Sequence, residues 1–397
     1  MRGARRWVVL SIFTLSSSLS FLDRQLLAAL AEVIKADFRL SNTEYGYILS
    51  AFSLVYAVSA PFAGYWIDRV GLNLGISICV VLWSLASVAT GYANGFAGLL
   101  GCRAWLGLAE SGGLPASGKA AALYLKPQER AVGSAFGQFG ISLGTVVAPL
   151  LATGLAAAHG WRSAFVVCGL FGFLWIPLWL WTARRFPPDE APPAGRVGTA
   201  ARLLLRDRRL YGLMAANVLS LTAYSVWMNW TTVFLVHTRG MAQEQANLRF
   251  AWIPPLFASL GGLAGGSLSL RFTRGTGEDL FAARLRACGV SALMMLATAA
   301  APYLPGDTLV TAAVCWSFFW TVAMSVNVYA LPLDFFGVER AAMGVSSLTF
   351  AYGLMQTVLS PAVGWLVDRY GFGPVCAIIA LLPGGAYWII RWTGRKK

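Results

Sequence analysis

The sequence predicts an all-α polytopic membrane protein with twelve transmembrane helices in two six-helix halves. Of its 397 residues, 57% are hydrophobic and only 12% are charged, and the mean hydropathy is +0.63. Apolar stretches of about 20 residues recur along the chain, and each is long enough to cross a bilayer as a helix. One long polar, proline-rich stretch separates the first six from the last six. This composition argues against a soluble enzyme.

The first span begins after a basic N-terminus and resembles a signal peptide, but no cleavage site follows it. Asp23 and Arg24 follow instead, so we expect a retained helix. In chain order the expected spans are 7–30, 45–66, 72–93, 97–124, 132–157, 163–183, 209–236, 249–270, 285–304, 308–333, 342–366 and 374–392.

The basic, proline-rich segment 186–208 is expected to be a flexible or surface-lying cytoplasmic linker. It divides an N-terminal half, 1–185, from a C-terminal half, 209–397. The second and eleventh spans end in similar turns, GYWIDRVG at 64–71 and GWLVDRYG at 364–371. These turns indicate either internal repetition or simply a compact charged turn between helices.

Glycine-rich stretches in the fifth and eighth spans, 133–154 and 261–266, suit helices that bend and pack closely. The formal net charge is +14. The basic residues collect in short segments on one side of the predicted spans and form no nucleic-acid-binding motif, so the positive-inside bias predicts cytoplasmic termini. We expect a multi-pass protein of the cell membrane, the inner membrane of a bacterium, with the lipid bilayer as its surroundings and no inferred protein or nucleic-acid partner. The positive residues assigned to the cytoplasmic side are Arg2, Arg5, Arg6, Lys126, Arg130, Arg184, Arg185, Arg202, Arg206, Arg208, Arg209, Arg271, Arg274, Arg284, Arg286, Arg391, Arg395, Lys396 and Lys397.

The fourth span carries Arg103, Glu110 and Lys119 within an apolar stretch. An ionised side chain at bilayer depth costs at least ~2.5 kcal/mol, so these groups require partners or a watery cavity. Arg103 and Glu110 are seven residues apart and share a helix face, about 10 Å apart along its axis. This span is therefore the leading candidate for function.

Enzymatic and metal chemistry find no support in the sequence. The six cysteines occur singly, without CxxC spacing, and His159 and His237 lie at the ends of outer loops. No phosphate-binding loop and no nucleophile triad is present. We expect neither an enzyme nor a metal site, and no cofactor other than protons as the coupling ion.

A family resemblance covers essentially the whole chain. The turn after the second span has the pattern GxxxDRxG and the fourth span has RxxxG (Arg103, Gly107), as in the major facilitator superfamily. Asn73 and Leu74 depart from that pattern, because a basic residue is common there. The resemblance implies the major facilitator fold and a gating turn made of Gly64, Asp68, Arg69 and Gly71.

A narrower resemblance is to the anion:cation symporter family. It is carried by FLDRQ at 21–25, RAWLGLAESGGLP at 103–115, KPQERAVGSAFGQFGISLGTVVAP at 126–149 and GWRSAFVVCGLFGFLW at 160–175. FAWIPPLFASLGGLAGG at 250–266 and the position of Lys119 are most similar to its bacterial hexuronate and sugar-acid transporters.

This resemblance implies that Arg24 binds the substrate carboxylate and that Tyr56 occupies a binding position. A guanidinium suits this role because it matches a carboxylate with two parallel hydrogen bonds. The alternative is a structural Arg24 neutralised by Asp23 or Glu110. Glu110 and Asp23 are the proton-coupling candidates, because burial and neighbouring charge control the protonation of a carboxyl group. Instead of coupling protons, Glu110 alternatively forms a static salt bridge.

Arg103 is the predicted charge partner in the N-terminal half. Asp23 is alternatively a fixed ion-pair partner of Arg103. Lys119 either helps to hold the anion or extends its amine to the interface. Polar and aromatic groups are expected to contact substrate hydroxyls, as in other ligand pockets, although helix packing explains most of them equally well. The substrate-binding candidates of this kind are Tyr56, Gln138, Tyr224, Asn229, Trp252 and Gln356. Trp227, Trp230 and Asn327 are further residues of the same kind.

The expected function is proton-coupled uptake of a small organic anion, a hexuronate or related sugar acid, by alternating access. Spans seven, eight, ten and eleven contain no interior Arg or Lys, which favours a single carboxylate over a phosphate ester. The alternatives are import of an aromatic acid or dicarboxylate, a non-transporting membrane sensor, an intramembrane enzyme and drug efflux.

Overall fold

The computed structural model describes residues 2–125, 129–187, 206–276 and 279–394. These residues are almost entirely helical and include no strand, which confirms the all-α prediction. The chain divides into two compact units. Unit 1 contains Met1–Ala194 and Gln243–Trp252, and unit 2 contains Gly195–Ala242 and Ile253–Lys397. Most of the predicted linker 186–208 lies outside the described residues.

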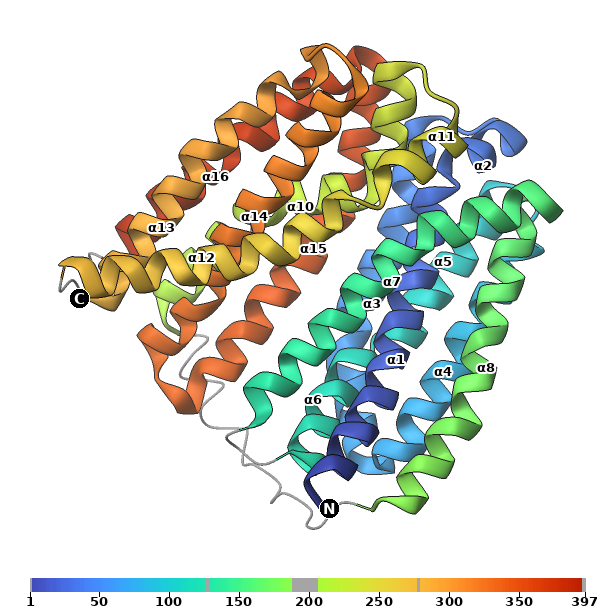
Figure 1. Ribbon diagram of the computed structural model, residues 1–397, viewed down its shortest axis with the longest axis horizontal. Coiled ribbons are helices and arrows are strands. Elements are labelled where there is room, and N and C mark those ends of the chain that lie inside the picture. Colours follow the sequence, from blue (N-terminus) through green and yellow to red (C-terminus); the bar gives the residue numbers. More distant parts are fainter. Residues whose placement is uncertain (1, 126–128, 188–205, 277–278, 395–397) are drawn as a thin grey trace. The chain divides into compact units, whose positions relative to one another are not determined.

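Unit 1 is a bundle in which α1 packs on α7 and α8, α3 on α5, and α4 on α8 (Figure 1). Its elements are α1 (Arg2–Ala29), α2 (Ala31–Phe38), α3 (Asn42–Val70), α4 (Leu72–Gly91), α5 (Phe96–Glu110), α6 (Gly113–Tyr124), α7 (Arg130–His159), α8 (Trp161–Arg185), α11 (Gln243–Ala246) and the π-helical turn η2 (Asn247–Ala251).

Unit 2 is built around α10 and α14, which pack on each other and on most of their neighbours. Its elements are α10 (Arg208–Arg239), α12 (Pro254–Thr276), α13 (Leu280–Met295), the 3-10 helix η3 (Leu296–Tyr303), α14 (Asp307–Phe336), α15 (Val338–Tyr370) and α16 (Phe372–Gly394).

Nine helical segments of the described chain are long and apolar enough to cross a membrane. The three predicted spans outside this set are 7–30, 97–124 and 209–236. They correspond to α1, the α5–α6 pair and α10. α1 carries Asp23 and Arg24, and α10 carries interior asparagines. The fourth predicted span is not one continuous helix, because α5 ends at Glu110 and α6 begins at Gly113.

Two glycine turns connect consecutive long helices in the same way. Gly71 ends α3 with φ +94°, and Gly371 ends α15 with φ +69°. Each donates its N–H to the carbonyl four residues earlier, at 3.0 Å. Positive φ favours glycine, which has no Cβ. Both predicted Asp-Arg turns therefore take the same compact form.

Glycine also permits close helix packing in both units. A Cβ on Gly144 of α7 would overlap the carbonyl oxygen of Ser18 in α1. A Cβ on Gly265 of α12 would overlap the carbonyl oxygen of Ala323 in α14. Small residues at such contacts let two backbones approach within membranes. The prediction that the fifth and eighth spans pack closely through glycine is confirmed.

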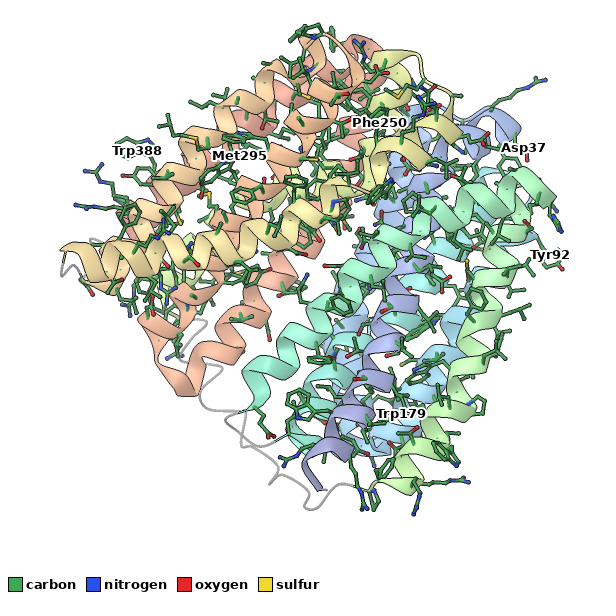
Figure 2. All side chains as sticks on the ribbon, viewed as in Figure 1. Asp37, Tyr92, Trp179, Phe250, Met295 and Trp388 are labelled. Atoms are coloured by element: carbon green, nitrogen blue, oxygen red, sulfur yellow. The ribbon has the colours of Figure 1, made fainter. Side chains whose placement is uncertain are left out.

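Different side-chain contacts lie toward the two ends of unit 1. Trp179 marks one end, and Asp37 marks the other (Figure 2). Trp179 stacks on Trp175 with ring centroids 5.6 Å apart, inside an apolar core. At the opposite end, Asp37 Oδ2 accepts hydrogen bonds from Trp161 Nε1 at 3.1 Å and Arg162 Nη1 at 2.9 Å.

The segment Gln243–Trp252, which runs into the eighth predicted span, packs within unit 1, although it follows α10 in the chain. Gln243 Oε1 accepts from the N–H groups of Glu32 at 2.9 Å and Val33 at 3.1 Å. The buried Asn247 donates through Nδ2 to the Ala29 carbonyl at 2.7 Å and to Thr153 Oγ1 at 3.0 Å. A division into halves at 186–208 did not anticipate this segment.

Candidate functional site

The structure pairs Arg24 of α1 with Glu110, the last residue of α5. Arg24 Nε donates a hydrogen bond to Glu110 Oε2, and the two side chains form an ion pair. The Arg24 side chain is 21% exposed, whereas the Glu110 side chain is fully buried. The guanidinium of this ion pair is therefore partly exposed, whereas its carboxylate is not.

Three aromatic rings surround the Arg24 guanidinium. Its Cζ lies 4.6 Å from the ring centroid of Phe21 and 4.8 Å from those of Phe52 and Tyr56. Tyr56 was predicted from the sequence, but Phe21 and Phe52 were not. Their spacing offered a signal, since Phe21 precedes Arg24 by three residues and Phe52 precedes Tyr56 by four. Residues at these spacings share a helix face.

Asp23 and Arg103 are both buried beside this pair. The Asp23 side chain accepts a hydrogen bond from Ser87 Oγ of α4 at 2.9 Å, a partner that the sequence did not indicate. Arg103 interacts electrostatically with Asp23, Glu110 and Tyr45. Among the described residues Arg103 and Asp23 form no ion pair within 4.0 Å, and the Arg103 guanidinium lies 5.8 Å from the Phe165 ring. Four ionisable side chains are thus gathered in unit 1, where the protonation of one affects the others.

Lys119 of α6 contacts the predicted gating turn. Its Nζ donates to Asp68 Oδ1 at 3.0 Å, to the Ile67 carbonyl at 3.0 Å and to the Asp68 carbonyl at 3.3 Å. Asp68 is mostly exposed, and Arg69 is exposed as well. Gly64 faces the ring of Pro115 in α6. A basic side chain from the fourth predicted span thus contacts this turn, which is followed by Asn73 and Leu74.

In unit 2, three predicted residues lie in α10 and α15. Gln356 Nε2 donates to Ser225 Oγ at 3.0 Å and to the Tyr352 hydroxyl at 2.8 Å. Asn229 Nδ2 donates to the Ser225 carbonyl at 2.9 Å. Tyr224 packs edge-on against Phe318 at 5.6 Å. Tyr224, Asn229 and Gln356 are half-buried, so each retains surface for a ligand.

The remaining candidates differ in their surroundings. Trp227 and Asn327 are fully buried and bonded to neighbours, Trp227 to Ser317 Oγ at 2.8 Å and Asn327 to the Gly265 and Ala323 carbonyls at 3.0 Å. Trp230 is equally buried. These three side chains serve helix packing. Gln138 of α7 is exposed, and the half-buried Trp252 donates to the Leu248 carbonyl at 3.1 Å.

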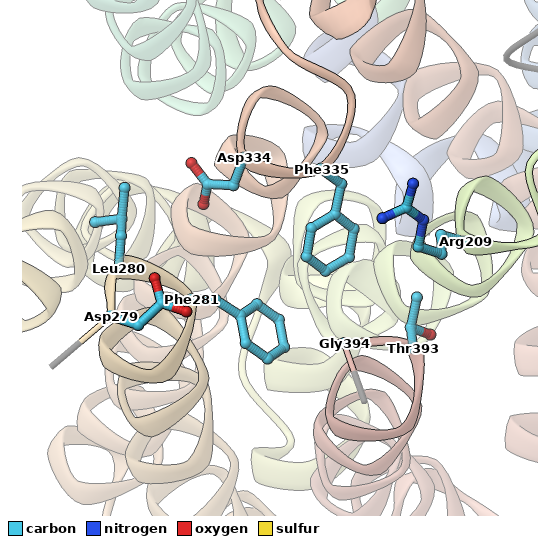
Figure 3. A pocket seen from close by; sticks show the side chains of 8 residues that line it. All are labelled: Arg209, Asp279, Leu280, Phe281, Asp334, Phe335, Thr393 and Gly394. Atoms are coloured by element: carbon cyan, nitrogen blue, oxygen red, sulfur yellow. The ribbon is translucent and has the colours of Figure 1, made fainter. Parts of the chain in front are cut away.

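A pocket of about 340 Å³ lies in unit 2 at the ends of α10, α13, α14 and α16 (Figure 3). Two of its three charged wall residues form ion pairs: Arg209 pairs with Asp207 at 2.8 Å and Asp334 pairs with Arg284 at 2.7 Å. The pocket contains none of the predicted site residues. Its wall consists of Arg209, Asp279, Leu280, Phe281, Asp334, Phe335, Thr393 and Gly394.

Known transporters resemble the chain in sequence. The hexuronate transporter of Escherichia coli K12 is 28% identical over 394 residues, which covers 95% of this chain and 91% of that protein. The galacturonate transporter of Dickeya chrysanthemi is 28% identical over 309 residues, covering 73% of this chain and 89% of that protein.

A solved structure shares the fold. It is a bacterial homologue of the human lysosomal transporter Spinster, in an inward-facing and occupied conformation. It superposes with a TM-score of 0.81 at 21% sequence identity and covers 99% of this chain and 97% of its own. The family model of the Major Facilitator Superfamily matches residues 13–353. These matches, together with the helical spans, show that the chain is a multi-pass transporter protein that belongs to the Major Facilitator Superfamily.

Proposed function

We propose that this protein imports a hexuronate or a related sugar acid together with protons, by alternating access. The observation that carries the proposal is the Arg24–Glu110 pair, in which a partly exposed guanidinium is backed by a buried carboxylate. The named hexuronate and galacturonate transporters among its relatives support the substrate class.

Arg24 is the proposed anchor for the substrate carboxylate. Its Nε is bound to Glu110, and the guanidinium also hydrogen-bonds the Tyr56 side chain. The remaining Nη donors are those proposed to bind the substrate carboxylate. The half-buried amides of Asn229 and Gln356 are proposed to bind sugar hydroxyls, with Tyr224 as an aromatic wall. Tyr56, Gln138 and Trp252 complete the proposed contacts.

Glu110 is the proposed coupling group. When a substrate carboxylate reaches Arg24, one guanidinium faces two carboxylates in a poorly solvated site. Leaving a buried charge without compensation is costly, so binding favours uptake of a proton by Glu110. Asp23, buried against Ser87, is the second group that can take up a proton. Reciprocally, protonated Glu110 frees the guanidinium for substrate.

We further propose that α1, the α5–α6 pair and α10 also cross the bilayer, which completes twelve spans with both termini in the cytoplasm of a bacterial cell. Their polar side chains lower the apolarity of these helices, yet they are paired or buried inside the units. Polar groups in a membrane protein are expected to face the bundle interior.

The test begins with the purified full-length protein and its ligand-induced thermal stabilisation. The panel contains D-glucuronate, D-galacturonate, benzoate and L-malate, each measured also on Arg24→Ala. Stabilisation by the two hexuronates that vanishes in the variant supports the proposal. Stabilisation by another acid, lost in the variant, replaces the substrate, and hexuronate binding that survives Arg24→Ala refutes the anchor.

A further inference from the structure

The guanidinium of Arg24 is held by rings from two helices. Phe52 and Tyr56 belong to α3 and stack on each other with centroids 5.6 Å apart and an interplanar angle of 25°. Phe21 belongs to α1, one helical turn before Arg24. All three rings lie within 4.8 Å of Arg24 Cζ. We call Phe21, Phe52 and Tyr56 the aromatic cage.

Two different forces therefore orient Arg24. The ion pair with Glu110 is charge-dependent, because a protonated carboxyl group attracts a guanidinium far less than a carboxylate does. The attraction between a cation and an aromatic face arises from the ring quadrupole, which does not change when a neighbour takes up a proton. The ion pair weakens at the step at which Glu110 is neutralised, whereas the ring contacts persist.

We propose that the aromatic cage holds Arg24 in its anion-binding orientation while Glu110 is neutral. This inference rests on the proposed function, in which Glu110 takes up a proton as substrate binds. It assigns Phe21 and Phe52 as positioning residues. The rings lie within 4.8 Å of the guanidinium carbon, and the Tyr56 side chain also hydrogen-bonds the guanidinium. These contacts preorganise the anchor without help from Glu110.

The test is a double-mutant cycle on anion affinity. The Kd of D-glucuronate is measured calorimetrically for wild type, Phe52→Leu, Glu110→Gln and the double variant, in the same detergent and at one alkaline pH, chosen so that Glu110 of the wild type keeps its charge. Gln replaces Glu as a neutral side chain of similar shape. Phe52→Leu is expected to weaken binding about threefold in wild type and about tenfold or more in the Glu110→Gln background.

Matched variants separate positioning from folding. Phe52→Tyr keeps the ring and is expected to bind like wild type in both backgrounds. Phe21→Leu removes a ring from the other helix and is expected to repeat the pattern of Phe52→Leu. Thermal unfolding without ligand shows whether each variant is folded. If the rings had a purely structural role, each substitution would weaken D-glucuronate binding by the same factor in wild type and in Glu110→Gln.

Equal losses in the two backgrounds, or no loss in either, overturn the cage proposal and leave the proposed function intact. If wild type does not bind D-glucuronate but binds benzoate or L-malate in an Arg24-dependent way, the substrate assignment fails. The cycle is then run with that acid, and the same excess loss in Glu110→Gln supports the cage. If no acid of the panel depends on Arg24, both proposals are overturned.

Discussion

Lys119 Nζ lies 3.0 Å from Asp68 Oδ1 and ties α6 to the end of α3. The same amine donates to the carbonyls of Ile67 and Asp68. The Ile67 carbonyl also accepts from the Gly71 N–H, and a cation near the end of a helix favours the helix dipole. Lys119 thus contacts the predicted gating turn from the neighbouring helix, in a chain that has Asn73 and Leu74 instead of a basic residue after that turn.

Lys119→Ala is expected to lower the maximal uptake rate several-fold while leaving the KM for substrate nearly unchanged, because the contact is with the turn. The loss of stability should be about 1 kcal/mol, since Asp68 is mostly solvent-exposed. Uptake into proteoliposomes at varied substrate concentration measures both constants. Lys119→Arg is the control that keeps the charge, and a tenfold rise in KM for Lys119→Ala would instead assign Lys119 to the anion.

Glu110→Gln is expected to bind substrate but to lose accumulation driven by a pH gradient. In wild type, uptake should rise as the external pH falls, because external protons load Glu110. In the variant this dependence should flatten, while exchange of labelled for unlabelled substrate continues. Proteoliposomes with an imposed gradient provide the measurement. Coupling through Glu110 is refuted if gradient-driven accumulation persists in the variant.

Asn247→Ala is expected to destabilise the protein by about 2 kcal/mol, since buried acceptors at Ala29 and Thr153 lose their donor. Thermal unfolding in detergent measures the change. Thr153→Val is the partial control, because it removes one of the two contacts and should cost less. An unchanged unfolding temperature for Asn247→Ala would show that the two Asn247 hydrogen bonds do not contribute to the stability of unit 1.

Gly144→Ala is expected to destabilise the protein by about 1–3 kcal/mol, because its Cβ would overlap the Ser18 carbonyl and push α7 away from α1. Gly154→Ala is the matched control on the same helix, since nothing lies within 4 Å of the added methyl group. The control should be neutral or slightly stabilising. Equal unfolding temperatures for the two variants would contradict the close approach.

Much of this protein can be predicted from its sequence. The apolar spans, the glycine at Gly71 and the charged residues Arg24 and Glu110 are local features. Hydropathy identifies the spans, positive φ favours glycine at a turn, and the cost of burying charge marks Arg24 and Glu110 as unusual. The sequence also indicated that Arg103 and Glu110 share one helix face.

Contacts between helices required the tertiary structure. Phe52 beside Arg24, Ser87 on Asp23, Lys119 on Asp68 and residues 243–252 within unit 1 all join segments distant in sequence. Periodicity states which side chains share a face of one helix, but it does not state which helix that face meets. In a membrane that choice depends on packing and on a few interhelical hydrogen bonds, because lipid tails are as apolar as the helix surfaces. Sequence therefore determined which residues are candidates, and tertiary packing decided which of them meet.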